Sequence, residues 1–313
     1  MPIKHLVLAG GGPLGFKFLG AIEYLNREKY WNRDDIESIY ATSIGGVIAA
    51  FICLNHDWET LNKYVIERPW DSAFKLNAKQ LFDVYYSKGL YGDNLIETIL
   101  KPLLRSKNLE TNISMKEFYE FSHIDLHLFT FDMNAFEILE ISYMSHPDML
   151  LIRAITMSCA LPGLFMPVFM DDGCYMDGGI LHNYPAGFCL RDHPDKSVIF
   201  GVNRGTKNKD NTTLTLLDKK NKVENIQIGT DFSILQFIVA ISVNIMNYIS
   251  GTVKQERLDN EIVIEDDIEG LSLDTIKRTM ESTAFREQLL KDGEKLGREF
   301  LASNNMDDIN ENK

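Results

Sequence analysis

HLVLAGGGPLG, residues 5–15, joins a short apolar run to three consecutive glycines. The apolar run has the length of one buried strand, and the glycines that follow it predict a tight turn. Beyond the turn, apolar residues recur at helical spacing, namely Phe16, Leu19, Ala21, Ile22 and Leu25. The stretch therefore predicts a strand, a glycine-rich turn and a helix in direct succession.

The same succession is repeated in the next segment of the chain. Residues 36–41 predict a second strand, Thr42-Ser43-Ile44 a tight turn, and residues 45–54 a helix rich in small side chains. Strands that alternate with helices along a chain typically form a parallel sheet. The N-terminal part thus predicts an α/β fold with a central, mostly parallel sheet flanked by helices.

Apolar periodicity and breaker residues predict the later elements as well. In chain order we expect helices within 58–122 with breaks at Arg68-Pro69 and Lys101-Pro102, strands at 127–131 and 137–143, a helix at 150–159, a hairpin centred on Asp171-Asp172-Gly173, a strand at 197–202, a surface loop at 203–224, an apolar helix at 232–249, a strand at 261–264 and a closing helix at 273–301.

The composition is that of an ordinary globular protein, with 45% apolar and 25% charged residues. The 32 basic and 45 acidic residues give a formal net charge of −13, which argues against a general nucleic-acid binder. The four cysteines form no CxxC pair, so neither a disulfide framework nor a zinc site is predicted. Because the first residues also lack the pattern of a secretory signal peptide, we expect a cytoplasmic protein.

The second turn has the form of a nucleophile site. A sharp strand-to-helix turn raises a serine hydroxyl out of its surroundings and aims the helix N-terminus at the reacting carbonyl. Small residues are required two places before and after the serine, because strand and helix approach closely there. Gly45 meets this requirement, and Ala41 is one methyl larger than glycine. The alternative is that Ser43 only caps the helix.

The first turn can supply the donors that such a nucleophile needs. Acyl transfer builds negative charge on a carbonyl oxygen, and in known enzymes the loss of one fixed N–H donor there costs about 3–4 kcal/mol. Gly10, Gly11 and Gly12 allow the backbone to come close and point N–H groups at an anion. The spacing of Gly10, Gly12 and Gly15 also fits a dinucleotide-binding fingerprint, and this motif alone does not separate the two interpretations.

A base for the serine is harder to identify. The seven histidines are scattered, and none has a convincing acidic partner in the sequence. Asp177 stands at the end of a predicted strand, and the two glycines after it leave space around its carboxylate. An ordinary β-turn aspartate is the alternative.

In combination, these motifs resemble the patatin-like phospholipase family. Residues 10–15 resemble its glycine-rich oxyanion loop, residues 41–45 its G-x-S-x-G elbow, and Asp177-Gly178-Gly179 its D-G-[GA] motif. Two further segments match in the same order: residues 130–134 are similar to T-x-D-x-N, and residues 154–168 to A-S-x-A-x-P-x-x-F-x-P. The resemblance covers roughly residues 5 to 200.

The resemblance implies a three-layer α/β fold and a serine lipid acyl hydrolase that needs no metal or cofactor. It implies that Ser43 attacks the acyl carbonyl of a phospholipid or acylglycerol and that Asp177 takes its proton directly, as a dyad. The amides that would hold the oxyanion are those of Gly10, Gly11, Gly12 and Ile44. Gly15, Ala41, Gly45, Gly178 and Gly179 would support these motifs. His182 is an alternative base, although the family uses none.

Two positions depart from the family's pattern. Ala41 replaces the first glycine of the elbow, and Leu14 stands where the family usually carries Lys or Arg beside the oxyanion loop. Loss of that cation would lower activity or shift substrate preference, so a weakly active or non-catalytic lipid-binding protein of the same fold is the competing hypothesis. A nucleotide-binding oxidoreductase is disfavoured, because the second strand ends at Ser43 and not at an acidic residue that would hold a ribose.

The expected organisation is a catalytic core over residues 1–205, a C-terminal part of the same domain over 206–302, and a flexible tail over 303–313. A lipid hydrolase also needs an apolar groove, for which the candidates are Phe16, Phe18, Leu161, Leu164, Phe165 and Phe169. The segment from Arg204 to Lys222 contains six basic residues and only two acidic ones, so it is a candidate for transient contact with anionic membrane lipid. A solvated loop is the alternative there.

Overall fold

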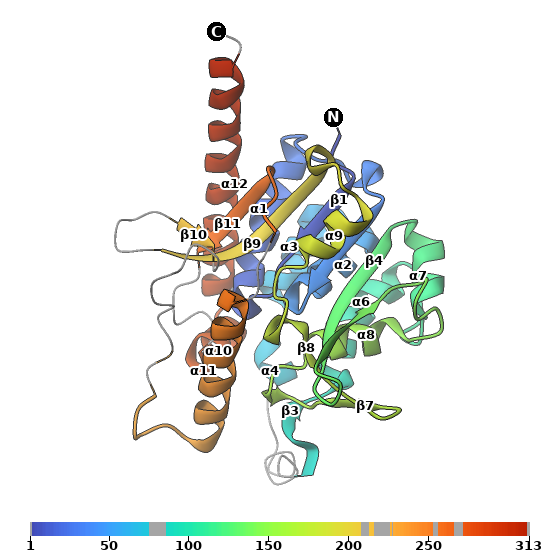
Figure 1. Cartoon of the computed structure of the whole chain (residues 1–313), viewed down its shortest axis with the longest axis vertical. Helices are drawn as coiled ribbons and strands as arrows, with labels where there is room; N and C mark the ends of the chain where they lie inside the picture. The colour runs from blue at the N-terminus through green and yellow to red at the C-terminus, as the bar shows by residue number, and fades with distance from the viewer. Residues whose placement is uncertain are drawn as a thin grey trace.

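The computed structural model of the chain describes residues 2–74, 86–207, 213–215, 226, 228–252, 256–265 and 272–311. Its centre is a mixed sheet whose main path runs β10-β9-β1-β2-β4-β8-β7, with β11 also paired to β9 and β5 to β4 (Figure 1). The strands of this sheet are β1 (His5–Leu8), β2 (Ser38–Thr42), β4 (Asp125–Asp132), β5 (Glu137–Ile141), β7 (Val168–Met170), β8 (Gly173–Asp177), β9 (Ile199–Lys207), β10 (Thr213–Thr215) and β11 (Glu261–Glu265).

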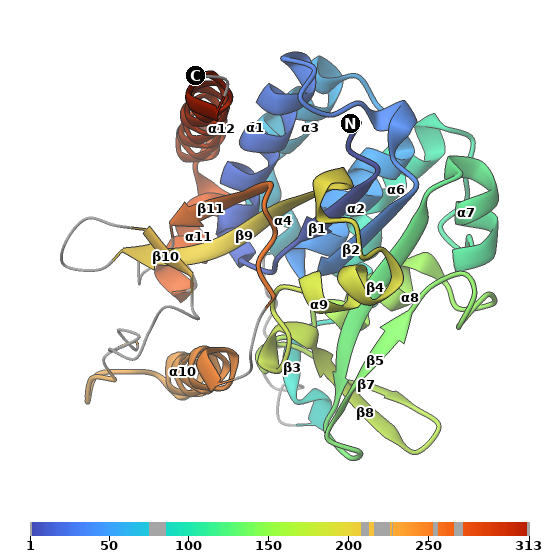
Figure 2. The same cartoon turned by 45° about the horizontal axis from the view of Figure 1, so that its top comes forward.

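Helices cover both faces of the sheet, which gives three layers. In Figure 2, α1, α2, α3 and α6 lie against one face and α9 against the other. The described α-helices are α1 (Gly15–Arg27), α2 (Ile44–Leu54), α3 (Trp58–Glu67), α4 (Trp70–Phe74), α6 (Asp93–Ser106), α7 (Met115–Ser122), α8 (Leu151–Ser158), α9 (Ala186–Asp192), α10 (Ile234–Thr252), α11 (Leu273–Glu281) and α12 (Thr283–Glu311). The expected three-layer α/β fold is therefore confirmed.

Parallel pairing brings the functional turns to one edge of the sheet. β1 lies parallel to β2, with Leu8 opposite Ala41, and parallel to β9, with Leu8 opposite Val202. The carboxyl ends of these three strands therefore meet, which is where open α/β sheets place their ligand sites. The glycine turn after β1 and the serine turn after β2 are thus neighbours because β1 and β2 are adjacent and parallel.

The region 58–122 is mainly helical in its described part, as expected, and one expectation about it is wrong. The expected break at Lys101-Pro102 is absent, because Pro102 lies inside α6. A short strand that was not expected, β3 (Gly89–Tyr91), pairs with β6 (Gly163–Phe165) in a second small sheet. Pro102 has no N–H to donate to the carbonyl four residues earlier in the helix. That carbonyl, of Thr98, accepts a hydrogen bond of 3.0 Å from Arg68 Nη2 instead.

Two expectations about the C-terminal part are also wrong. β9 continues to Lys207, so the segment expected to be a surface loop begins as a central strand, and β10 pairs with it. The single closing helix is two helices, α11 and α12, which meet at Ser282. α12 extends to Glu311 and includes most of the segment expected to be a tail. Within the described parts of the chain, no helix is both long and apolar enough to cross a membrane.

The C-terminal helix joins the core through glycines. α12 packs closely on α1, and a Cβ atom built on Gly293 would lie 2.0 Å from the carbonyl oxygen of Lys17. In the opposite direction, a Cβ on Gly20 would lie 2.1 Å from the carbonyl oxygen of Leu290. The two backbones therefore touch at these points, and neither position has room for a side chain.

Gly293→Ala should destabilise the fold by about 1–3 kcal/mol, because the new methyl group forces α12 away from α1. Gly187→Ala in α9 is the matched control, since the nearest atom to its Cβ is a side-chain carbon at 3.8 Å. There the alanine should be neutral or stabilising by up to about 1 kcal/mol through helix propensity. Urea unfolding followed by circular dichroism measures both. Equal effects of the two substitutions would contradict the close packing.

Candidate active site

Ser43 stands on a strained turn at the end of β2. It is the residue before α2 and adopts φ 55° and ψ −127°, a conformation that a non-glycine residue rarely takes. A Cβ on Gly45 would lie 2.6 Å from the carbonyl oxygen of Leu8, so the first turn of α2 can approach β1 only with glycine there. The methyl group of Ala41 is fully buried in the core, so the departure from glycine at that position is accommodated.

Asp177 meets this serine from the end of β8, two strands along the same sheet from β2. Ser43 Oγ donates a hydrogen bond of 2.7 Å to Asp177 Oδ2, although 134 residues separate the two in the chain. The second carboxylate oxygen, Oδ1, accepts a hydrogen bond of 2.7 Å from the N–H of Gly179. A Cβ on Gly178 would lie 2.4 Å from the carbonyl oxygen of Phe129, so this turn also requires glycine. The aspartate is thus fixed at both oxygens.

Burial sets the protonation of Asp177, whose side chain is only 3% exposed. Desolvation raises its pKa to about 6 from the ordinary 3.8. The hydrogen bonds from Ser43 and Gly179 and the positive charge of Arg204 act in the opposite direction. The carboxylate is therefore ionised at neutral pH and more basic than an exposed aspartate, as proton abstraction from an alcohol requires.

Ser158 anchors the turn, a role that sequence reasoning missed. The backbone N–H of Ser43 donates to Ser158 Oγ at 2.9 Å, and that hydroxyl donates to the carbonyl of Phe129 at 2.7 Å. Ser158 lies at the end of α8 and is fully buried. A chain of two hydrogen bonds thus ties the strained residue to β4. The sequence signal was present, because Ser158 belongs to the segment 154–168 that resembles the family.

The glycine turn provides donors, but not all of those expected. The N–H of Gly10 donates to the carbonyl oxygen of Asn183 at 3.1 Å, and Asn183 Nδ2 returns a bond of 3.0 Å to the carbonyl of Gly10. The Gly10 amide is therefore engaged, and the expectation that it faces an oxyanion is wrong. Gly11, Gly12 and Ile44 line the same cavity as Ser43. Their amides are the candidates for an oxyanion hole.

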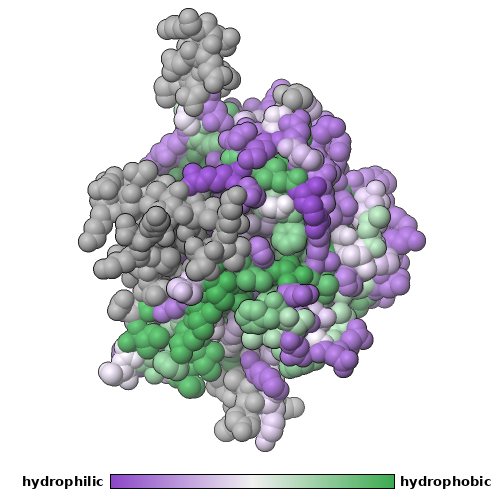
Figure 3. Space-filling model, in the orientation of Figure 1, coloured by the Kyte–Doolittle hydropathy of each residue, from purple (hydrophilic) through white to green (hydrophobic). Residues whose placement is uncertain are grey.

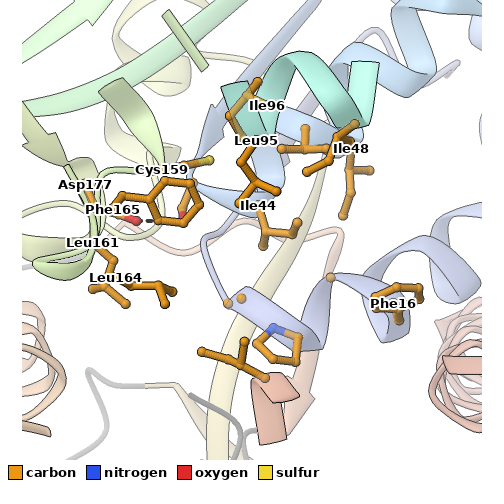
Figure 4. Close-up of a pocket in the computed structure, with 18 of the residues that line it drawn as sticks. Phe16, Ile44, Ile48, Leu95, Ile96, Cys159, Leu161, Leu164, Phe165 and Asp177 are labelled. Carbon is orange, nitrogen blue, oxygen red and sulfur yellow. Dashed lines mark hydrogen bonds between the residues drawn. The ribbon is translucent and has the colours of Figure 1, made fainter. Parts of the chain in front are cut away.

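An apolar cavity opens from the serine (Figure 4). Leu161, Leu164 and Phe165 lie beside Asp177, and side chains of α2 and α6 line the cavity further on, among them Ile44, Ile48, Leu95 and Ile96. Four of the expected groove residues line it: Phe16, Leu161, Leu164 and Phe165. Two expectations are wrong, because Phe18 is buried in the core and Phe169, 55% exposed, lies outside the cavity.

The comparison with known families settles the relationship. The family model described as patatin-like phospholipase matches residues 6–190, more than half of the chain. The chain belongs to this family. The resemblance of the motifs to patatin-like phospholipases is thereby confirmed, and lipid hydrolysis is the activity that the membership indicates in general terms.

Three known proteins illustrate the relationship of this patatin-like chain. The uncharacterized protein R571 of Acanthamoeba polyphaga mimivirus is 26% identical over 265 residues, which cover 84% of this chain and 83% of that protein. The probable lipid hydrolase 463L of invertebrate iridescent virus 6 is 24% identical over 196 residues, covering 62% and 66%. The crystal structure of VipD from Legionella pneumophila has a TM-score of 0.53 at 16% identity, covering 97% and 67%. That last likeness shows the shared fold.

Arg204 is placed very differently from the expectation of a surface loop. It lies in β9, its side chain is 5% exposed, and it lines the cavity together with Ser43 and Asp177. It is therefore not available for contact with membrane lipid. The lysines expected to share that role, Lys209, Lys219, Lys220 and Lys222, lie outside the described residues, and Lys207 is described only as the end of β9.

The histidine alternative receives no support from the patatin-like site. The hydroxyl of Ser43 bonds to Asp177, whereas the His182 ring packs edge-on against Phe188 at 5.5 Å. Burial lowers the pKa of His182, so the ring is neutral. Its backbone carbonyl accepts a bond from Thr42 Oγ1. His182 therefore contributes to the turn through its main chain.

One group of potential metal ligands lies elsewhere, between α9 and the strands β4 and β5. His127, Glu140 and Asp192 place their ligand atoms within 4.8 Å of one another. Both nitrogens of His127 are already bonded, Nε2 to Asp125 and Nδ1 to Glu140. Burial opposes protonation of this ring, but those two carboxylates outweigh it and raise its pKa to about 9. A doubly bonded imidazolium is an ion-pair partner and a poor metal ligand.

The reactivity of Ser43 should rise with pH through about 6. Asp177 can accept the serine proton only when it is ionised, and its raised pKa places that transition near 6 instead of near 4. The second-order rate of fluorophosphonate labelling, followed by gel fluorescence between about pH 4.5 and 8, measures it. Thermal unfolding over the same range controls for loss of structure. A rate already at its plateau at pH 5 would contradict the buried base.

Proposed function

We propose that the chain hydrolyses carboxylic ester bonds of phospholipids or acylglycerols through Ser43 and Asp177. The observation that carries the proposal is the 2.7 Å hydrogen bond between the serine hydroxyl and a buried carboxylate at one end of an apolar cavity. Such a cavity suits an acyl chain, and the polar groups at its end suit the ester.

The reaction follows from the positions of these groups. Ser43 Oγ attacks the acyl carbon while its proton passes to Asp177 Oδ2, and the carbonyl oxygen becomes negative near the amides of Gly11, Gly12 and Ile44. The ester C–O bond breaks, and the leaving alcohol takes the proton from Asp177. Water then attacks the acyl-enzyme, gives its proton to Asp177, and Ser43 leaves with that proton as the fatty acid is released.

Two features favour this function over a non-catalytic lipid binder of the same fold. A strained residue costs about 1–3 kcal/mol and is kept where the geometry is used, and Ser43 is such a residue. Burying an ionisable aspartate is also unfavourable, and Asp177 has been placed against the one hydroxyl that such a base would activate. A binding protein would need neither feature. The viral relative named a probable lipid hydrolase agrees with the proposal.

Ser43→Ala should abolish both fluorophosphonate labelling and fatty-acid release from mixed liposomes. Asp177→Asn should lower release by at least about a thousandfold, because the amide cannot accept the proton. Asp177→Asn should also unfold at the same or a higher temperature, since a buried charge is removed. Mass spectrometry of the released fatty acids identifies the ester class. Activity that survives Ser43→Ala would exclude this mechanism.

Peripheral contact with lipid is better assigned to α10 than to the lysine-rich segment. α10 carries no Asp, Glu, Lys or Arg. Val239 and Val243 are buried and Met246 lines the cavity, so one side of the helix covers the active site. The other side exposes large apolar residues: Ile234, Phe237, Ile238, Ile245 and Tyr248. Figure 3 shows the apolar surface in the region where Figure 1 places α10. Its uncharged surface fits a zwitterionic bilayer that delivers the substrate to the cavity.

The double substitution Ile234→Lys and Tyr248→Lys should weaken binding to phosphatidylcholine vesicles by about tenfold or more, because two exposed apolar anchors are lost. These side chains are 75% and 72% exposed, so the fold should tolerate the change. Gln288→Lys on α12 adds a lysine at an exposed position away from α10 and is the control. Sedimentation with vesicles measures binding. Unchanged binding of the double variant would rule out α10 as the contact surface.

A further inference from the structure

Arg204 is a buried cation at the active site. The pairing of β1 with β9 places Val202 opposite Leu8, so Arg204 lies two residues further on, beside the glycine turn. Its side chain lines the cavity that Ser43 and Asp177 also line. Most of the other lining side chains are hydrocarbon. A guanidinium is expensive to bury in such surroundings unless its charge is compensated, which points to an electrostatic role.

We propose that Arg204 is a positioning residue that keeps Asp177 as a carboxylate and balances the negative charge of the site throughout the reaction. The proposal rests on the hydrolase function proposed above. Arg204 is the only Lys or Arg among the described residues that line the cavity. The glycine turn contributes no cation of its own, since Leu14 points into the core.

The net charge of the site before and after proton transfer explains why a cation is useful there. Before the reaction, the negative charge is on Asp177 and the serine is neutral. After proton transfer, Asp177 is neutral and the charge has moved to the acyl oxygen. A fixed cation in the same cavity balances both states, whereas without it the site carries an uncompensated negative charge in each. In an apolar cavity that charge is strongly disfavoured, because little solvent screens it.

The other groups around Asp177 do not supply this charge. Ser43 contributes a hydroxyl and Gly179 an N–H. Cys159 lies close by, but burial raises the pKa of its thiol far above the ordinary value, so it stays neutral. Met246, which reaches the cavity from α10, is uncharged. Arg204 is thus the described group whose positive charge opposes the effect of burial on Asp177.

The test compares Arg204→Met, Arg204→Gln and Arg204→Lys by the pH dependence of kcat/KM on an uncharged ester such as p-nitrophenyl butyrate. Removing the cation in Met or Gln should move the acidic limb of this profile to higher pH, because the carboxylate loses a positive charge that shares its cavity. The plateau should fall by about tenfold or more. Lysine keeps the charge and should keep the limb close to its original position. If the Met variant fails to fold, Gln and Lys still decide the outcome.

Arg286→Met is the matched control for loss of a buried arginine. Arg286 is 2% exposed, is not among the residues that line the cavity, and donates to the backbone carbonyls of Ile66, Thr279 and Met280. Its substitution should lower the unfolding temperature without moving the acidic limb. An unshifted limb with a normal plateau in the Met and Gln variants would overturn the proposal. If the variants only raised KM, and only for an anionic phospholipid, the proposal would also be overturned, and Arg204 would instead bind the head group of the substrate. Failure of the hydrolase function itself would show separately, as activity that Ser43→Ala leaves intact.

Discussion

The contact between Gly45 and the carbonyl of Leu8 is the constraint on which the site depends. The first turn of α2 lies so close to β1 that a methyl group at position 45 would overlap the Leu8 oxygen. This approach forces the chain to turn sharply at Ser43, and the strained backbone there is the consequence. The strain persists because its surroundings fix it: Ser158 holds the amide of Ser43, and Asp177 holds the hydroxyl. Packing energy from the core thus positions Ser43.

Asp177 shows the opposite relation between stability and function. Its raised pKa means that the folded protein binds a proton more tightly than an unfolded chain does, so the stability of the fold falls as pH rises from about 4 through 6. At neutral pH the carboxylate therefore costs stability. The same burial makes it a stronger base toward Ser43. The hydrogen bonds from Gly179 and Ser43, together with the charge of Arg204, limit this cost because they favour the ionised form.

Local features of the site could be predicted from the sequence, and long-range ones could not. The glycine turn, Ser43 and Gly45 follow from strand–turn–helix patterns within a few residues. The contact of Ser43 with Asp177 came only from the resemblance, because periodicity carries no information across 134 residues. The place of Arg204 in the cavity was not predicted, because the residues that follow it in the sequence are polar and indicated a surface loop. Its burial depends partly on β11, which pairs Ile264 with it from about sixty residues further along the chain. The position of Pro102 inside a helix was not predicted for a similar reason, since the carbonyl that it leaves unbonded is satisfied by Arg68, at the end of α3.

The residues that line the cavity come from both sides of the end of the family match at residue 190. Ser43, Asp177 and the glycine turn all lie within residues 6–190, which the family model covers. Arg204, Met246, Ile276 and Met280 line the same cavity and lie beyond that range. β9 and β11 continue the central sheet without interruption, so we infer that the C-terminal part is built into the same domain. On the function proposed above, the matched segment would supply the groups that break the ester bond. Arg204 and part of the apolar wall would come from the segment beyond the match.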